Sequence, residues 1–355
     1  MRLLTLLLAA LPAAAGTLFV GAWPARLLVI DEASEKMIGE IPLATGVPRS
    51  IIRSHDKKKL FVTSMKDSGI EVIDLATRKV IKSFKLNSGG KIVRLGGIEP
   101  DPQDKVLYAT AYTVEKKIDR WVVGKPKWVV IDIEQEKITK EVDFSKEDEQ
   151  SGFARFSPLR VSPDGKFLYM FRENIQIYST DDFKPVEKIE LSKSSFPGME
   201  RVFLRPGDDP FEEPGTVLGL FNSTDPVVHR SIFGIAKLDL LKRTVDFKPV
   251  APATQGTMGL YLTPDRKQGY TVAFNGGGMN RRNEFWALDL QTGQIARKQE
   301  FEGRTRFSFK ISSDGKSLYL FGAGNTLEIY DAATMKMKKE IDVNADMTTD
   351  MVVIP

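Results

Sequence analysis

Arginine is the residue type whose spacing in this chain most favours a binding site. Three arginines each stand seven residues before an aspartate that belongs to a recurrent turn: Arg49, Arg94 and Arg201 before Asp56, Asp101 and Asp208. Arg155 and Arg306 stand near the same point, out of register by two residues and by one. Several guanidinium groups at one mouth would attract a carboxylate, a phosphate or an acidic protein surface. Pairing with nearby acidic residues, or lining a water-filled tunnel, is the alternative role for these arginines.

Other chemistry-bearing residues are few. The chain has no cysteine and only two histidines, His55 and His229. Without cysteine it can form neither a thiolate metal site nor a covalent attachment for c-type haem. The histidines have no metal-binding spacing, so we predict no metal site built from them. His55 is expected to be a solvated turn residue. His229 is expected at the surface, with an acid–base or ligand role as the alternative.

The elements that must position these residues come from an internal repeat. A strand, a tight turn and a second strand recur seven times, at Leu28–Lys36, Gly69–Lys79, Val129–Lys137, Ile175–Lys184, Ile235–Thr244, Phe285–Gln294 and Leu327–Lys336. An upstream hairpin accompanies the repeat, most clearly at Val161–Met170 and Ile311–Leu320. Two hairpins make a four-stranded antiparallel sheet, and a ring of such sheets buries faces that one sheet alone leaves exposed. The repeat therefore predicts an all-β, seven-bladed β-propeller.

The first blade has only three strands near the N-terminus, predicted at Thr17–Gly21, Leu27–Asp31 and Met37–Leu43. The segment Thr349–Ile354 matches the innermost strands of the other blades and then stops. We therefore predict that the C-terminal strand completes the first blade, which closes the ring and removes an exposed sheet edge.

Residues 1–15 have the pattern of a cleaved secretory leader. Arg2 is followed by the apolar run Leu3–Leu11 and by the small residues Ala13–Ala15. The apolar run is too short to span a bilayer. We therefore expect an exported, periplasmic protein whose residues 16–355 form a single propeller. A formal net charge of +4 gives no overall electrostatic case for nucleic-acid binding.

Three blades carry insertions between their second and third strands, at Tyr112–Lys127, Asn222–Ser231 and Asn275–Asn283. In a propeller these connections lie on one face, and long loops on one face often mark a binding surface. The residues predicted to form this partner-binding rim are Arg120, Trp121, Lys125, Asp225, His229, Arg230, Asn275, Asn280, Arg281 and Arg282. A further long loop, Arg205–Gly215, is predicted on the opposite face.

The repeats resemble the YVTN-type propellers through VIDLATRKV, VSPDGKFLY and ISSDGKSLY. A closer resemblance, to the propeller (beta) subunit of quinohemoprotein amine dehydrogenase, is carried by Val106–Val130, Leu327–Lys339 and Asp346–Pro355. This resemblance implies a periplasmic subunit that catalyses nothing alone and holds no cofactor. It also implies a di-haem cytochrome c-type subunit and a small subunit carrying cysteine tryptophylquinone, with the propeller as docking surface and part of the active-site wall. No catalytic residue is carried over.

Two other functions remain open from the sequence. One is a stand-alone cell-envelope propeller that binds a protein or an anionic ligand. The other is a propeller hydrolase of the lactonase type that holds a Ca²⁺-type ion in its channel through oxygen ligands. The sequence does not show the several inward-facing acidic or amide side chains that such an ion site requires.

Overall fold

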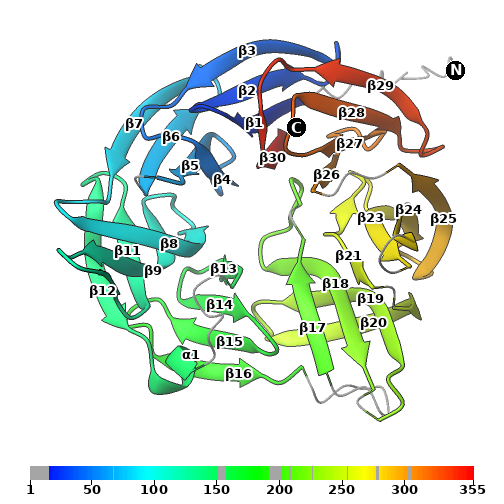
Figure 1. Ribbon diagram of the computed structural model, residues 1–355. Coiled ribbons are helices and arrows are strands. Elements are labelled where there is room, and N and C mark those ends of the chain that lie inside the picture. The colour runs from blue at the N-terminus through cyan, green and yellow to red at the C-terminus, as the bar shows by residue number, and fades with distance from the viewer. Residues whose placement is uncertain are drawn as a thin grey trace, which may run out of the picture.

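The computed structural model describes residues 16–66, 68–150, 157–191, 201–207, 209–225, 227–253, 255–276, 280–302 and 306–355, and for residues 150, 201 and 349 the backbone only. Within these ranges seven antiparallel sheets surround a central axis as the blades of a propeller (Figure 1). The predicted architecture is confirmed. The predicted leader lies outside the described residues. No helix among the described residues has the length and apolar character of a membrane span.

The first three blades lie in the N-terminal part of the chain. Blade one contains β1 (Thr17–Ala22), β2 (Arg26–Asp31), β3 (Lys36–Pro42) and the C-terminal β30 (Met347–Ile354). Blade two contains β4 (Pro48–Arg53), β5 (Lys59–Ser64), β6 (Gly69–Asp74) and β7 (Lys79–Lys85). Blade three contains β8 (Lys91–Pro100), β9 (Val106–Lys116), β10 (Trp121–Val123), β11 (Lys127–Asp132) and β12 (Lys137–Asp143). The short helix α1 (Lys146–Gln150) follows blade three.

The other four blades follow in chain order. Blade four contains β13 (Leu159–Val161), β14 (Phe167–Phe171), β15 (Ile175–Ser179) and β16 (Pro185–Ile189), and blade five contains β17 (Arg201–Pro206), β18 (Thr216–Thr224), β19 (Ser231–Asp239) and β20 (Thr244–Pro252). Blade six contains β21 (Gly256–Thr257), β22 (Tyr261–Leu262), β23 (Gln268–Asn275), β24 (Arg282–Asp289) and β25 (Gln294–Phe301), and blade seven contains β26 (Ser308–Ile311), β27 (Ser317–Phe321), β28 (Thr326–Asp331) and β29 (Met337–Asp342).

The burial of each strand follows its place in the blade. In blade two, every residue of β6 except Asp74 is buried, whereas in the outermost strand β7 exposed residues alternate with residues that are half-buried or, at Phe84, buried. The middle strands are covered on both faces by neighbouring blades, so their sequences read as nearly continuous apolar runs. The turn between β6 and β7 is stabilised by Asp74, which accepts hydrogen bonds from the N–H and the hydroxyl of Thr77.

Aromatic side chains fill the spaces between blades. Trp128 of blade three is 1 % exposed. Its ring stacks on Phe183 of blade four with centroids 5.2 Å apart, and Tyr178 lies against it at 4.8 Å. Trp128 therefore packs between blades three and four. Offset and tilted ring pairs of this kind add to the burial of apolar area that holds neighbouring blades together.

The predicted closure of the ring by the two chain ends is confirmed. Strand β30 pairs antiparallel with β1, with Leu18 opposite Val353 and Phe19 opposite Val352 (Figure 1). These side chains are buried, Val353 among residues of blades one and seven and Val352 among residues of blades one and two. The C-terminal strand therefore supplies the innermost part of the core on both sides of blade one.

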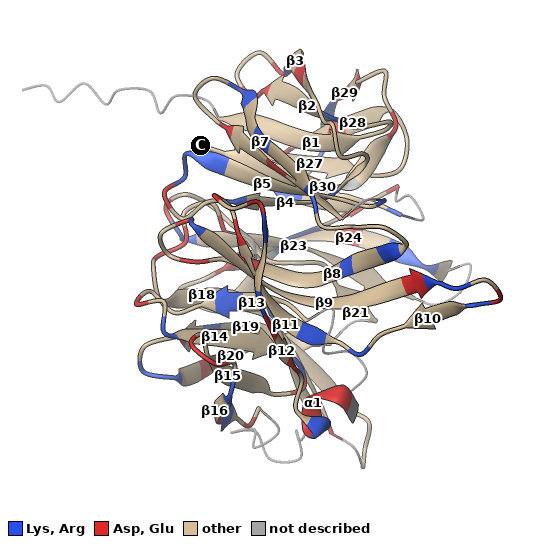
Figure 2. Ribbon diagram, turned by 90° about the vertical axis from the view of Figure 1, so that its left-hand side faces the viewer, with Lys and Arg blue, Asp and Glu red and all other residues tan. Residues whose placement is uncertain are grey.

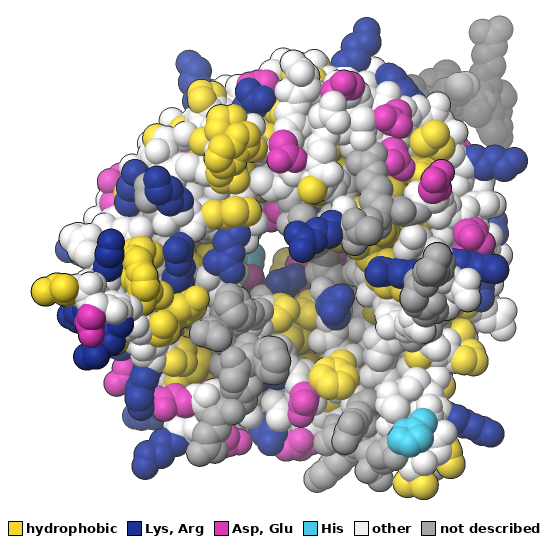
Figure 3. Space-filling view, viewed as in Figure 1, with side chains coloured by type: hydrophobic (Ala, Val, Ile, Leu, Met, Phe, Trp, Pro, Cys, Tyr) yellow, Lys and Arg dark blue, Asp and Glu magenta, His cyan; other side chains and the backbone are white. Residues whose placement is uncertain are grey.

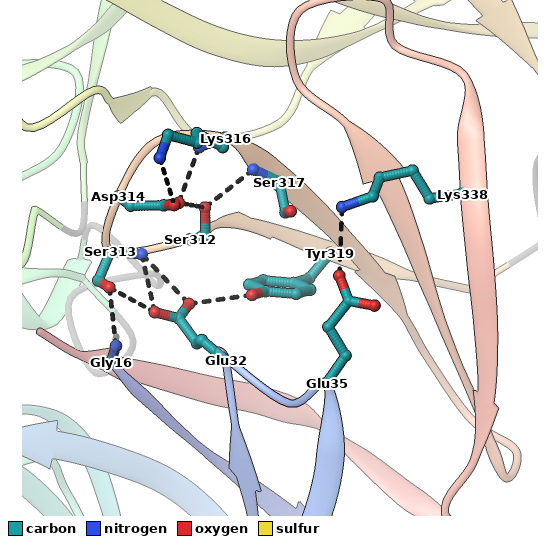
Figure 4. Close-up of polar contacts among 10 residues, drawn as sticks. All are labelled: Gly16, Glu32, Glu35, Ser312, Ser313, Asp314, Lys316, Ser317, Tyr319 and Lys338. Carbon is teal, nitrogen blue, oxygen red and sulfur yellow. Dashed lines mark hydrogen bonds and ion pairs between the residues drawn. The ribbon is translucent and has the colours of Figure 1, made fainter. Parts of the chain in front are cut away.

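A polar cluster joins blades seven and one beside this closure (Figure 4). The carboxylate of Glu32 accepts hydrogen bonds from the N–H of Ser313 at 3.1 Å, from its hydroxyl, and from the hydroxyl of Tyr319 at 3.0 Å. The Ser313 hydroxyl accepts in turn from the N–H of Gly16 at 3.1 Å. Burial raises the pKa of Glu32, and the hydrogen bonds from Ser313 and Tyr319 oppose that rise.

Two blades depart from the predicted four strands. In blade three the segment predicted as a loop is largely strand, because Tyr112–Lys116 extends β9 and Trp121–Val123 pairs with it as β10. In blade six the innermost strand is interrupted, and both of its pieces, β21 and β22, pair with β23. The other two insertions are also shorter than predicted, since residues 222–224, 231, 275, 282 and 283 lie in strands.

Candidate functional site

The most prominent feature of the surface is the hairpin formed by β9 and β10, which extends beyond one face of the ring (Figure 2). We call this face of the ring the insertion face. The innermost strand of each blade begins on it, and the second strand connects to the third on it. Ile118 at the tip is fully exposed, and Trp121 is 54 % exposed. Val122 and Val123 are also exposed. The hairpin therefore presents apolar side chains to solvent, where they contribute nothing to the core of the propeller.

Charged residues surround these apolar side chains. The Nζ atom of Lys116 lies 5.8 Å from the centre of the Trp121 ring. Arg120 forms an ion pair with its neighbour Asp119 at 3.3 Å, and Lys125 reaches Glu149 of α1 at 3.0 Å. Arg120, Trp121 and Lys125, predicted as rim residues, thus all belong to an exposed surface with mixed apolar and basic character.

The second insertion forms a tight turn between β18 and β19. The carboxylate of Asp225 accepts hydrogen bonds from the N–H groups of Val227 and Val228, which lower its pKa. The turn exposes the side chains of Val227, Val228, His229 and Arg230. Asp225 therefore shapes the turn, and the residues it presents again combine apolar and basic groups.

The third insertion joins β23 to β24, and Asn275 pairs with Arg282 at its base. The guanidinium of Arg281 lies 4.4 Å from the centre of the Phe274 ring, and Arg282 contacts Glu300 at 3.8 Å. Asn280 is exposed. The described residues of this insertion include two arginines and no acidic residue.

Two of the five predicted mouth arginines make contacts between blades. Arg49 of blade two donates to the carbonyl of Leu95 in blade three at 2.6 Å, and Arg94 of blade three donates to the carbonyl of Met65 in blade two at 2.7 Å. Arg306 is exposed just before β26. Arg155, and the side chain of Arg201, lie outside the described residues. Lys and Arg side chains nevertheless gather around the central opening on this face (Figure 3).

A cavity of about 630 Å³ opens at the other end of the channel. We call it the opposite-mouth cavity. Innermost strands of several blades contribute charged side chains to it: Arg53 from β4, Glu99 from β8, Arg160 from β13, Lys310 from β26 and Asp350 from β30. The long loop after β17 adds Asp209, Glu212 and Glu213, in agreement with the prediction that this loop lies on the opposite face. His55 also lines the cavity, with its Nε2 atom 3.1 Å from the carbonyl of Pro100.

Glu99 is a buried carboxyl group in this cavity. Its side chain is nearly completely buried, and Oε1 accepts a hydrogen bond from the N–H of Val161 at 3.2 Å. Burial raises the pKa of Glu99 to about 7, although the positive charges of Arg160 and His55 oppose the rise. A carboxyl group that titrates near neutral pH inside a cavity is suited to proton exchange with a ligand.

Arg160 lies between two carboxylates. Its guanidinium donates to the carbonyls of Leu159 and Gly207, both at 2.9 Å. Its nitrogens lie 3.8 Å from the carboxylate of Glu99 and 3.8 Å from that of Glu212. The carbonyls fix the plane of the guanidinium, and the two carboxylates share its charge at a distance too long for a strong hydrogen bond.

Glu99 was not among the residues predicted from the sequence, although the repeat contains a signal for it. Asp101 occupies the turn position that Ser54, Ser162, Thr263 and Ser312 occupy in other blades, because its N–H donates to the carbonyl of Val106 as that of Ser162 donates to the carbonyl of Phe167. Its carboxylate accepts from the N–H of Val106 at 2.8 Å, as the Ser162 hydroxyl accepts from that of Phe167 at 2.9 Å. Glu99, two residues earlier, therefore corresponds to Arg160 and Lys310, which also line the cavity. A charged residue two positions before the turn residue is the signal that could have identified it.

The described residues contain no group of three or more His, Asp or Glu side chains placed to hold a metal ion. The acidic residues of the opposite-mouth cavity share it with Arg53, Arg160 and Lys310. A Ca²⁺ site requires six to eight oxygen ligands around one point. The described part of the cavity thus offers no such arrangement.

Comparison with known proteins identifies the fold and no more. No protein-family model and no curated protein matches the chain. Among solved structures, dihydro-heme d1 dehydrogenase NirN in complex with DHE is 15 % identical, with a TM-score of 0.54 over 97 % of this chain and 78 % of that one. The periplasmic gluconolactonase PpgL of Pseudomonas aeruginosa is 13 % identical, with a TM-score of 0.56 over 96 % and 99 %. Hydrazine synthase of Kuenenia stuttgartiensis is 14 % identical, with a TM-score of 0.52 over 86 % and 95 %.

Proposed function

We propose that this propeller is a non-catalytic, partner-docking subunit of a periplasmic redox complex similar to quinohemoprotein amine dehydrogenase. The observation that carries the proposal is the distribution of exposed apolar side chains. On the insertion face these are Trp23, Met65, Ile118, Trp121, Val122, Val123, Phe203, Val227 and Val228. On the opposite face the described turns expose Leu241, and Met37, Val186 and Met337 are exposed within the first two residues of outermost strands that begin there. One face of the ring is thus suited to contact with another protein.

The chemistry of the insertion face defines the partner. Trp121 and the apolar tip of its hairpin are the type of anchor that occupies a pocket in an interface. Arg230, Arg281 and Arg282 favour an acidic surface around such a pocket. In the proposed complex the partners are a c-type cytochrome subunit and a quinone-bearing subunit, which hold the haem c and the cysteine tryptophylquinone. This propeller supplies the docking surface and part of the wall of the active-site cavity.

The experiment is purification of the native protein from its own periplasm, followed by gel filtration with detection of haem absorbance. We expect the propeller to elute in a complex that absorbs in the Soret region. Ile118→Asp combined with Trp121→Ala should release the propeller as a monomer. The matched control is Ile81→Asp, which places the same charge on the outermost strand β7. A native protein that elutes alone and without haem would contradict the proposal and favour a stand-alone propeller.

A further inference from the structure

The outer edge of β10 is an unpaired sheet edge on the insertion face. Strand β10 pairs with β9 on one side, and no described residue pairs with it on the other side. Figure 2 shows β10 along the margin of the protruding hairpin. We propose that an acidic, extended segment of the partner protein adds to this edge as a further β-strand. This inference rests on the proposed docking function, because it names how the partner is held.

The hydrogen bonds of the hairpin determine which residues of β10 face β9. The N–H of Lys117 donates to the carbonyl of Arg120 at 2.8 Å, and the N–H of Gly124 donates to the carbonyl of Thr113 at 2.7 Å. Both pairs continue the register of β9 and β10. Hydrogen-bonded pairs alternate along an antiparallel ladder, so Val122, midway between Arg120 and Gly124, also faces β9 with its backbone groups.

The backbone groups of Trp121 and Val123 therefore point away from β9. Lys116, which lies opposite Trp121, follows the same alternation, because its N–H donates to the carbonyl of Gly90 at 3.3 Å on the other side of β9. Within the described part of the chain, the backbone groups of Trp121 and Val123 have no hydrogen-bond partner. Two N–H donors and two carbonyl acceptors are thus available to an added strand, at the alternate positions that a β-ladder requires.

The side chains of the hairpin suit a strand in which apolar residues alternate with polar ones. Trp121 and Val123 project from one face of the hairpin and Val122 from the other, because successive side chains of a strand alternate. All three are exposed. Val114 lies opposite Val123, and Ile92 lies opposite Val114, which makes an apolar row across β8, β9 and β10. An apolar residue of the added strand would extend this row.

The charge of the hairpin favours an acidic strand over a second copy of this chain. The segment Tyr112–Lys127 contains four lysines and one arginine against two acidic residues, a net charge of +3. The side chains of Arg120 and Lys125, which flank β10, are 72 % and 74 % exposed, although they form surface ion pairs with Asp119 and Glu149. Two copies paired edge to edge would bring like charges together, whereas a segment with Asp or Glu would be attracted to this edge.

The test is the binding of two synthetic seven-residue peptides to the mature chain. One peptide alternates glutamate with valine, and the other has lysine in place of glutamate. Fluorescence anisotropy of the labelled peptides should show the glutamate peptide bound at one site per chain, at least tenfold more tightly than the lysine peptide. In the bound state, hydrogen–deuterium exchange at the amides of Trp121 and Val123 should be at least tenfold slower. Absence of binding at millimolar concentration, or unchanged exchange at these two amides, would overturn the proposal.

Two substitutions of Val123 separate strand addition from contact by side chains. Val123→Pro removes an outward N–H, a change that an edge strand tolerates, and should weaken binding of the glutamate peptide at least tenfold. Val123→Thr is the matched control, because it keeps the N–H and the shape of the side chain, and its affinity should stay within threefold of the wild type. Circular dichroism should show a folded propeller for both variants. Equal affinities of the two variants would refute strand addition.

Gel filtration separates the failure of this inference from the failure of the proposed function. If Val123→Pro remains in the haem-containing complex, docking on the insertion face stands and strand addition is wrong. If the native protein elutes alone while the glutamate peptide still protects the amides of Trp121 and Val123, the redox complex is wrong and strand addition stands. A wild-type dimer that Val123→Pro abolishes would make a second copy the occupant of the edge and would overturn the proposal of an acidic partner strand.

Discussion

The carboxylate of Glu32 in blade one lies 3.0 Å from the hydroxyl oxygen of Tyr319 in blade seven (Figure 4). The two residues are 287 positions apart in the chain, and their contact lies beside the point where the ring closes. Two features therefore stabilise the closure of the ring: the pairing of β1 with β30 and the polar cluster around Glu32.

Replacement of Glu32 by alanine should lower the free energy of unfolding by about 1–3 kcal/mol, because it leaves buried donors of Ser313 and Tyr319 without their acceptor. Urea denaturation followed by circular dichroism measures the change. The matched control is Glu35→Ala, which removes ion pairs with Lys338 at 3.2 Å and Lys339 at 3.6 Å at the surface of the same junction. Such pairs contribute about 0–1 kcal/mol. Equal losses in both variants would contradict the role given to Glu32.

Deletion of Asp350–Pro355 should prevent stable folding, because it removes most of β30 and opens the ring. Val353→Ala is the milder change and should lower the free energy of unfolding by about 1–3 kcal/mol, since Val353 is buried between blades one and seven. Thermal melting measures both. A deletion variant that melts at the temperature of the full chain would show that the closure is not needed.

Glu99 should make the stability of the protein depend on pH. Its pKa is about 7 when folded, against a usual value of 4.5, so between these values the folded state holds a proton that the unfolded state has lost. The free energy of unfolding therefore falls as pH rises from 4.5 to 7, by about 3 kcal/mol from this group. Glu99→Gln should show a correspondingly flatter dependence in urea titrations across that range. An unchanged slope would mean that Glu99 titrates normally in the folded protein.

Substitution of Arg49 should lower the stability of the protein and substitution of Arg306 should not, although the repeat places both residues near the same point of their blades. Arg49→Gln should lower the free energy of unfolding by about 1–2 kcal/mol, because it breaks the hydrogen bond to Leu95 in the next blade. Arg306→Gln should leave stability unchanged, because Arg306 is exposed. If the insertion face docks an acidic partner, Arg306→Gln should also weaken that association most at low salt. The reverse pattern of stability would contradict the contact made by Arg49.

The sequence alone was sufficient to predict the fold, because each repeat is specified by residues that are close together in the chain. Each hairpin is specified by alternating residues and a turn such as that at Asp74, and seven copies with one incomplete blade leave few alternatives to a closed ring. The three-stranded start and the unmatched strand near Val352 also predicted the closure, since an unpaired edge requires a partner. The extent of strand in Tyr112–Lys127 was not predicted, because cross-strand pairing such as Trp121 with Lys116 has no local signal beyond an apolar run.

The roles of single charged side chains were decided only by the tertiary structure. The identical spacing of Arg49 and Arg94 predicted a shared site, yet each guanidinium finds a carbonyl of the neighbouring blade, and the distance between blades is not encoded in the spacing. Glu99 stands at the position that Arg160 and Lys310 occupy in other blades, but its burial and its raised pKa exist only because β13 and the loop after β17 enclose it. Local sequence determines the hairpins, whereas the desolvation and the charge at the channel arise only when seven blades surround one axis.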